Sequence, residues 1–299
     1  MDRALKRLVE IKGILRALGA QRRGRREAFT DATVALVYYL AVVHNQTQKW
    51  ACDPAHWPFK VPPGGLPSPS QFSRRLRRPS MRRLLENVEH HVRELDPVPT
   101  DRVVALKIDG RPLPIGPHSH DKHAGYGRAA GGKARGYKLH AITDDCGRLV
   151  AWKIAAMNKD ERTMAARMIK DLACVGYVLA DKNYDSAELF GLARTRGLQM
   201  VVPRRRGPNK GLGRRKQDPA RTRSRDLLET PNHDFGHDLY LTRAAIERTF
   251  GLHATTPELL THLPAWIRGY PKVRRWVQAK LTLAELHRQD LARPNSAVA

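Results

Sequence analysis

The 299-residue sequence has few cysteines and no apolar run long enough to cross a membrane. Its three cysteines, Cys52, Cys146 and Cys174, are odd in number and far apart, which argues against a disulfide framework or a cysteine zinc site and favours a reducing compartment. The longest predominantly apolar stretch, residues 32–43, has 12 residues, whereas a membrane-spanning helix needs about 20, so we expect a buried helix there. The first thirty residues lack the apolar core and cleavage site of a secretory signal, so we expect a cytoplasmic protein without membrane contact.

Acidic residues are also scarce. The 29 Asp and Glu residues oppose 54 Lys and Arg residues, which gives a formal net charge of +25. Such an excess of positive charge indicates a polyanionic partner. The hydrophobic fraction of 41% and the charged fraction of 28% are nevertheless those of a folded protein, so most of the chain is not a disordered basic tail. At roughly 100–200 residues per domain, the chain has room for a small domain followed by a larger one.

The first hundred residues have the periodicity of helices. Leucine and isoleucine recur at helical spacing over residues 5–18, and the apolar stretch 32–43 predicts a second helix. After a loop rich in proline and glycine over residues 50–70, residues 70–92 predict two short helices split by Pro79, with the spacing of a helix-turn-helix. The expected helix caps are Thr30 or Asp31, Ser70 and Ser80.

Strand-like and helical patterns alternate after the prolines of residues 97–100. We expect strands at residues 103–108, 137–143, 149–155, 177–180 and 198–203, and helices at residues 160–172 and 186–196, from about residue 241 and after residue 271. Residues 118–127 are expected to form a polar loop. This order predicts an α/β domain with a mixed sheet flanked by helices, preceded by a small all-α domain.

Three carboxylates stand at positions suited to chemistry. Asp109 and Asp181 each follow a predicted strand, where open α/β sheets build their sites, and Glu247 lies on a predicted helix. Three carboxylates brought together repel one another and need positive charge to stay ionised. A pair of hard divalent ions such as Mg²⁺ or Mn²⁺ provides that charge through oxygen ligands and can activate a phosphodiester for displacement.

The sequence around these residues resembles a known family. The segments IDGRPLPI, LADKNYDSAELF and YLTRAAIERTFG are similar to the three acidic blocks of DDE-type bacterial insertion-sequence transposases, over roughly residues 100–290. The resemblance implies a ribonuclease-H-like catalytic domain in which Asp109, Asp181 and Glu247 are the catalytic residues and hold two Mg²⁺ or Mn²⁺ ions. Tyr240 and Arg243 match the conserved tyrosine and arginine of the glutamate block. The sequence departs from the family pattern at two positions, Asn183, where glycine is frequent, and Ala254, where lysine is usual.

The same resemblance implies an organisation and an activity. We expect a helical DNA-binding domain at residues 1–99, a catalytic domain at residues 100–292 with a basic insertion at about 204–239, and a tail at residues 293–299. The implied activity is that of a DNA transposase, which hydrolyses and transfers strands at the ends of an insertion sequence. Its partner is double-stranded DNA, bound by a homodimer on paired ends in the bacterial cytoplasm at the nucleoid. The alternatives are a catalytically inactive DNA-binding protein derived from such an element and a structure-selective nuclease on the same fold.

Eleven basic residues and one tyrosine around these blocks are the expected DNA contacts. They are Arg243, Tyr240, Lys182, Lys138, Arg74, Arg75, Arg78, Arg204, Arg205, Arg206, Arg214 and Arg215. His140 shares a strand face with Lys138 and is expected to point the same way. For the arginine runs, solvated or disordered charge is the simpler interpretation.

Plainer interpretations exist for the acidic residues and the histidines as well. Asp109 is also typical of a turn and Asp181 of a helix cap, while Arg243 and Glu247 have the spacing of a surface ion pair. Two polar groups remain open as transition-metal sites, one formed by His118, His120 and His123 and the other by His233, Asp234, His237 and Asp238.

Overall fold

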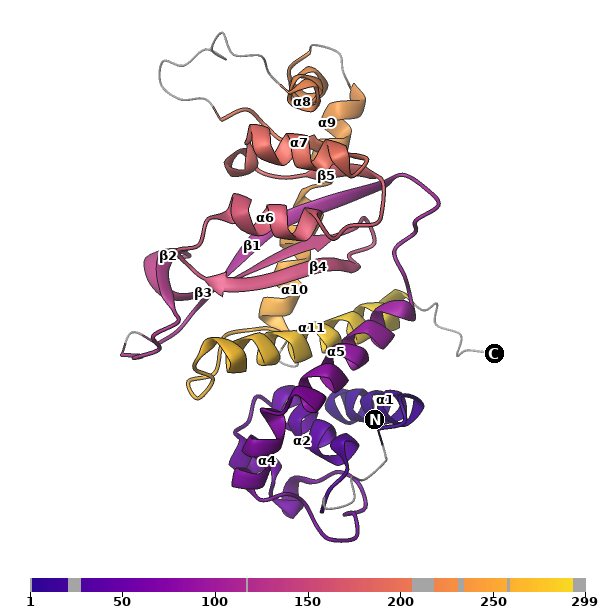
Figure 1. Ribbon diagram of the computed structural model, residues 1–299, viewed down its shortest axis with the longest axis vertical. Coiled ribbons are helices and arrows are strands. Elements are labelled where there is room, and N and C mark those ends of the chain that lie inside the picture. Colours follow the sequence, from indigo (N-terminus) through magenta and orange to yellow (C-terminus); the bar gives the residue numbers. More distant parts are fainter. Residues whose placement is uncertain are drawn as a thin grey trace. The chain divides into compact units, whose positions relative to one another are not determined.

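The computed structural model describes residues 2–20, 28–116, 118–205, 218–230, 234–256 and 259–292 (Figure 1). Contacts between Cα atoms divide the chain into two compact units. A helical unit combines residues 1–96 with residues 253–299, and a sheet unit comprises residues 97–252. Within the described residues, no helix has the length and apolar character needed to span a membrane.

The helical unit is built around an apolar helix. Its elements are α1 (Arg3–Ala17), α2 (Asp31–Val43), α3 (Gln48–Ala51), the 3-10 helix η1 (Pro54–His56), α4 (Pro69–Leu76), α5 (Pro79–Glu94) and α11 (Tyr270–Ala292). Almost every side chain of α2 is buried, as its composition predicts. Residues 271–292 were expected in the catalytic domain, but α11 packs on α5 and α2, because its apolar face, including Val273 and Trp276, is buried there.

Prolines decide where two of these helices begin. Pro69 and Pro79 occupy the first helical position of α4 and α5, where the missing N–H costs no hydrogen bond. Ser70 and Ser80, expected as caps, therefore lie inside the helices. The cap of α4 is Ser68, which forms a capping box with Gln71, and α5 has no side-chain cap.

The sheet unit contains a six-stranded mixed sheet. Its elements are β1 (Val104–Pro114), β2 (Gly125–Ala129), β3 (Gly132–Thr143), β4 (Leu149–Ala156), α6 (Glu161–Ile169), β5 (Gly176–Leu179), the 3-10 helix η2 (Lys182–Tyr184), α7 (Ala187–Thr195), β6 (Leu198–Val201), α8 (Pro219–Glu229), α9 (Asp234–Leu241) and α10 (Ala244–Thr255), the last of which crosses into the helical unit. The strands follow the order β2-β3-β1-β5-β6, and β4 also pairs with β3. Strands β1, β5 and β6 are parallel, whereas β2, β3 and β4 run in antiparallel pairs.

Helices cover both faces of this sheet. On one face, Val178 and Met200 pack with residues of α6 and α7, including Met168 and Phe190, in a large apolar core. On the opposite face, Leu179 and Val201 pack with Leu227 of α8, with Leu239 and Tyr240 of α9 against them. The alternation of neighbouring strand residues between two apolar layers explains why β5 and β6 read as continuous hydrophobic runs.

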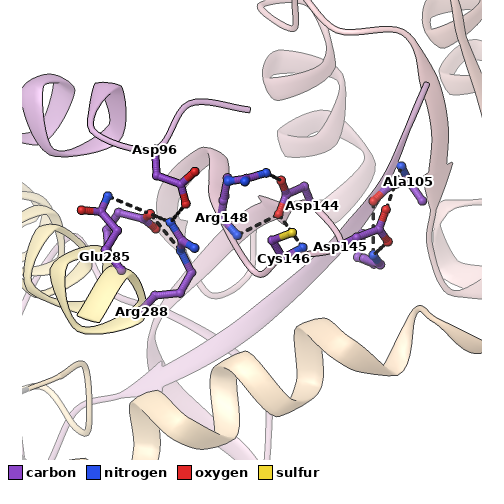
Figure 2. A network of polar contacts seen from close by, with 10 residues as sticks. Asp96, Ala105, Asp144, Asp145, Cys146, Arg148, Glu285 and Arg288 are labelled. Carbon is purple, nitrogen blue, oxygen red and sulfur yellow. Dashed lines mark hydrogen bonds and ion pairs between the residues drawn. The ribbon is translucent and has the colours of Figure 1, made fainter. Parts of the chain in front are cut away.

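Two aspartates order the turn between β3 and β4, Asp144 within the turn and Asp145 against β1 (Figure 2). Asp144 accepts hydrogen bonds from the backbone N–H groups of Cys146 and Arg148, each at 2.9 Å, and its other oxygen pairs with the Arg148 guanidinium. Asp145 forms an ion pair with Lys107 of β1, whose side chain is buried. In the helical unit, Figure 2 also shows Arg288 bound to Asp96 and Glu285.

The structure differs from the expected elements at four places. Strand β1 does not end at Asp109 but continues to Pro114, because residues 110–114 pair with β3. Strand β2 forms where a loop was expected, and α8 lies inside the basic insertion. The glutamate-bearing helix begins at Ala244 rather than near Leu241, because a turn at residues 242–243 separates α9 from α10.

Candidate active site

The register of the sheet brings the first two aspartates together. Strand β1 pairs in parallel with β5, and the last pair of this ladder is Lys107 with Leu179. Asp109 and Asp181 each follow that pair by two residues. Both carboxylates therefore lie at the carboxyl end of the parallel ladder, where β5 leaves β1, which is the usual position for a site in an α/β sheet.

Local hydrogen bonds orient each of the two carboxylates. The backbone N–H of Gly110 donates to Asp109 Oδ1 at 2.7 Å. Asp181 caps the short helix η2 and accepts hydrogen bonds from the backbone N of Asn183 at 2.8 Å and from its side-chain Nδ2 at 3.2 Å. Asn183, where the family often has glycine, thus holds the Asp181 carboxylate with its side chain as well as its backbone.

Arg243 connects the glutamate to the aspartates. Its Nη2 donates to Glu247 Oε1 at 2.7 Å, and its guanidinium carbon lies 6.0 Å from the centre of the Tyr240 ring. Tyr240 and Glu247 were expected on one face of a single helix. They belong instead to α9 and α10, and the turn that carries Arg243 brings the two side chains to the same guanidinium.

The pKa of Asp109 reports the charges around it. This pKa is raised from the ordinary 3.8 to about 6, mainly by burial and to a smaller extent by the charges of Asp181 and Glu161. The Gly110 N–H and the charge of Arg243 act in the opposite direction. Asp109 therefore feels the charges of two other carboxylates, Asp181 and Glu161, and the opposing charge of Arg243.

Glu161 is a member of this cluster that sequence reasoning missed. It follows the helix cap Asp160 and looks like an ordinary acidic residue of a first helical turn. In the fold its carboxylate forms an ion pair with Lys138, and the space beside both is kept open by Gly110, where an added Cβ would lie 2.9 Å from Lys138 Cδ. Lys138, expected to contact DNA, is thus largely buried and neutralised.

Tyr184 is a second residue whose position only the fold reveals. It belongs to the same block as Asp181, and its side chain is completely buried. Burial raises the pKa of its hydroxyl well above the ordinary value, as do the charges of Glu161, Asp109 and Asp181. The ring therefore forms an uncharged apolar support near the carboxylates.

His140 does not point toward DNA. Its side chain is fully buried in β3, and burial lowers its pKa to about 4, so the ring is neutral at pH 7. The expectation from its strand face was wrong because β3 is an inner strand between β1 and β4 and α6 packs against it.

The expected arginine contacts occupy three kinds of place. Arg74 and Arg78 are exposed in the helical unit, but Arg75 is buried there, bound to Asp31 and to the carbonyl of Phe29, so its side chain is not available to DNA. In the sheet unit, Lys182 and Arg205 are exposed, and Arg204 pairs with Glu229 at 3.4 Å. Arg206, Arg214 and Arg215 lie outside the described residues.

The donor chemistry of Asp109 and Asp181 fits a hard divalent cation. Two neighbouring carboxylates supply oxygen ligands, and a cation between them would offset burial, the main cause of the raised pKa of Asp109, as well as the smaller repulsion from Asp181. The third ligand is not assembled with them: over the described part of the chain, no three His, Cys, Asp or Glu side chains gather closely enough to hold a metal. The two histidine groups are equally unassembled there, and His233 lies outside it.

Comparison with known proteins agrees with this arrangement. A family model described as a transposase DDE domain matches residues 103–256, which contain all three acidic residues. No curated protein and no solved structure matches the chain. The mixed six-stranded sheet flanked by helices, with an all-helical region before it, is consistent with a ribonuclease-H-like fold. Because the match covers more than half of the sequence, the chain belongs to the DDE transposase family.

Proposed function

We propose that this protein is a DNA transposase that hydrolyses phosphodiester bonds at the ends of an insertion sequence and transfers the freed strand to a target. Asp109, Asp181 and Glu247 are its catalytic carboxylates. The observation that carries the proposal is the shared register of the two aspartates at the end of the β1–β5 ladder. Arg243, paired to Glu247, also lies close enough to Asp109 to lower its pKa, which supports a common site for all three.

The residues divide the work between holding metal and holding DNA. Two Mg²⁺ or Mn²⁺ ions, when bound, activate the attacking oxygen and stabilise the leaving oxygen of the phosphodiester. Asp109 and Asp181 would supply oxygen ligands for these ions, and Glu247 would supply a further one. Release of Glu247 frees the Arg243 guanidinium, whose planar fork suits a phosphate.

The partners follow from the family and the charge. The substrates are the double-stranded ends of the element and the target DNA, held by a homodimer on paired ends in the bacterial cytoplasm. Exposed cations beside the site, Lys182 and Arg205, and on the helical unit, Arg74 and Arg78, are suited to phosphate contacts.

Substitution of the carboxylates tests the proposal. Asp109→Asn, Asp181→Asn and Glu247→Gln each remove a ligand charge but little surface, so each is expected to lower Mg²⁺-dependent cleavage of element-end duplexes by a thousandfold or more while binding persists. Asp171→Asn is the matched control, because Asp171 is an exposed aspartate of the same unit, paired only loosely to Lys153 at 3.8 Å.

The outcomes separate the alternatives. Wild-type protein that binds element ends but never cuts them with Mg²⁺ or Mn²⁺ is the inactive DNA-binding protein. Cleavage without strand transfer indicates a nuclease. Cleavage within tenfold of the wild type in any of the three variants removes that residue from the site.

A further inference from the structure

Strands β2 and β3 begin as a two-stranded ribbon with one strongly basic face. Residues 122–143 contain five Lys or Arg residues and no Asp or Glu. Figure 1 shows β2 beside the first part of β3, and the register pairs Tyr126 with Arg135 and Arg128 with Lys133. Because cross-strand partners share a face, these four side chains form one surface, here called the ribbon face.

The opposite face of the ribbon fixes its orientation. It carries only small residues, and two of them are glycines in close contact with residues that follow β4. A Cβ at Gly125 would lie 2.2 Å from Asn158 Oδ1, and one at Gly127 would lie 2.6 Å from the carbonyl oxygen of Met157. The glycine side is therefore pressed against the protein, and the ribbon face must point outward.

The ribbon face is exposed and its charges are not neutralised. The Tyr126 side chain is 60% exposed, with Lys133 Nζ 5.6 Å and Arg135 Cζ 5.9 Å from its ring centre. Arg128 and Lys133 are exposed, and neither has a carboxylate partner within the parts of the chain that the structure describes. The Tyr126 ring and these two cations are therefore open to a ligand from solvent.

Arg135 adds positive charge to the same surface while it binds the loop before β2. Its guanidinium donates to the carbonyl oxygens of Ser119 at 2.8 Å and Asp121 at 2.6 Å. These acceptors are uncharged, so Arg135 holds the preceding loop in place and keeps its positive charge beside Tyr126.

We propose that the ribbon face binds the phosphate backbone of duplex DNA, with Arg128 and Lys133 as phosphate contacts and Tyr126 between them. The face extends over two strands about 4.8 Å apart, and Gly131 and Gly132 at the turn add no side chains that would keep a DNA backbone away. A second copy of this face is excluded as the partner because its like charges repel. The inference rests on the proposed function, which supplies duplex DNA as the substrate.

Salt-dependent binding tests this surface. The experiment measures the affinity of the full chain for a 30-base-pair duplex by fluorescence anisotropy at several salt concentrations. Each lost phosphate contact lowers the slope of log K against log salt by about 0.9. Arg128→Gln with Lys133→Gln is therefore expected to lower the slope by about 1.8 and to weaken binding on the order of 10- to 60-fold near 0.1 M salt.

The matched control removes the same charge from another surface of the unit. Arg167 and Lys170 are exposed at the end of α6. Arg167→Gln with Lys170→Gln is expected to leave the slope within about 0.3 of the wild type, and thermal melting checks that both double variants are folded.

Three results are decisive. If wild-type protein fails to bind the duplex, the proposed function fails. If it binds and the ribbon variant has an unchanged slope, or one no lower than that of the control, only the inference about the ribbon is overturned. A loss confined to a single-stranded 30-mer, with duplex binding intact, assigns the surface to unpaired strands and overturns it as well.

Discussion

Arg221 binds the carboxylate of Asp185 with two parallel hydrogen bonds. The distances are 2.9 Å from Nε to Oδ1 and 2.9 Å from Nη2 to Oδ2, and the Asp185 side chain is only 3% exposed. The same carboxylate accepts the backbone N–H of Arg205 at 2.9 Å. Asp185, four positions after Asp181, therefore holds residues on both sides of the basic segment 206–217.

Loss of this bidentate pair is expected to destabilise the sheet unit. Asp185→Asn leaves a partly buried guanidinium without its counter-charge, so we expect the free energy of unfolding to fall by about 2–4 kcal/mol. Asp226→Asn removes an exposed aspartate paired to Arg225 and is expected to change it by less than about 0.5 kcal/mol. Urea denaturation compares the two, and equal effects would show that the Asp185 pair contributes nothing.

The raised pKa of Asp109 predicts a dependence of stability on pH. In the folded protein Asp109 keeps its proton up to about pH 6, whereas in the unfolded chain it loses the proton near pH 3.8. Asp109 therefore contributes fully to the free energy of unfolding below about pH 4, and this contribution is lost as the pH rises to about 6. At 1.36 kcal/mol per pKa unit it amounts to at most about 3 kcal/mol.

Comparison with Asp109→Asn isolates that contribution. In buffer containing a chelator, the stability of the variant relative to the wild type is expected to increase between pH 4 and pH 6 and to remain constant above. Urea denaturation at pH 4, 5, 6 and 7 measures the difference. A constant difference over this range would mean that Asp109 titrates normally in the folded protein.

Arg243 is expected to control the ionisation of Asp109. Its charge lowers the pKa of that carboxyl, so Arg243→Gln should raise the pKa and move the pH-dependent stability change to higher pH. Arg248→Gln is the matched control, because Arg248 is exposed on α10, the helix that begins directly after Arg243. Carboxyl NMR titration measures the pKa of Asp109 directly. An equal change of this pKa in both variants would show that it responds to the net charge of the protein and not to the proximity of Arg243.

Two adjacent arginines of α4 are expected to separate stability from DNA binding. Arg75 is buried against Asp31, so Arg75→Gln should lower the free energy of unfolding by about 2–4 kcal/mol. Arg74 is exposed, so Arg74→Gln should leave stability within about 0.5 kcal/mol and lower the salt slope of DNA binding by about 0.9. A loss of stability in Arg74→Gln together with a lower salt slope in Arg75→Gln would contradict this assignment of the two residues.

The fold and the three acidic blocks were largely readable from the sequence. Strand and helix periodicities are local, and most of the predicted elements of the sheet unit formed within a few residues of their expected bounds. Strand β2 was not predicted, because its glycines are poor strand formers and pair only through contact with β3 and the chain beyond β4.

What each charged side chain does was decided by partners distant in sequence. Asp109, Asp181 and Glu247 are recognisable from the sequence because their three blocks follow one another along the chain in the order of the family. The sequence alone does not separate Arg75 from Arg74, and the separation follows from Asp31, 44 residues away. Asp185 likewise meets Arg221 across 36 residues, and Lys138 meets Glu161 across 23. An ion pair depends on the distance between atoms in space, so composition and spacing locate the charges, and only the packing of strands and helices determines which of them are paired and which are exposed.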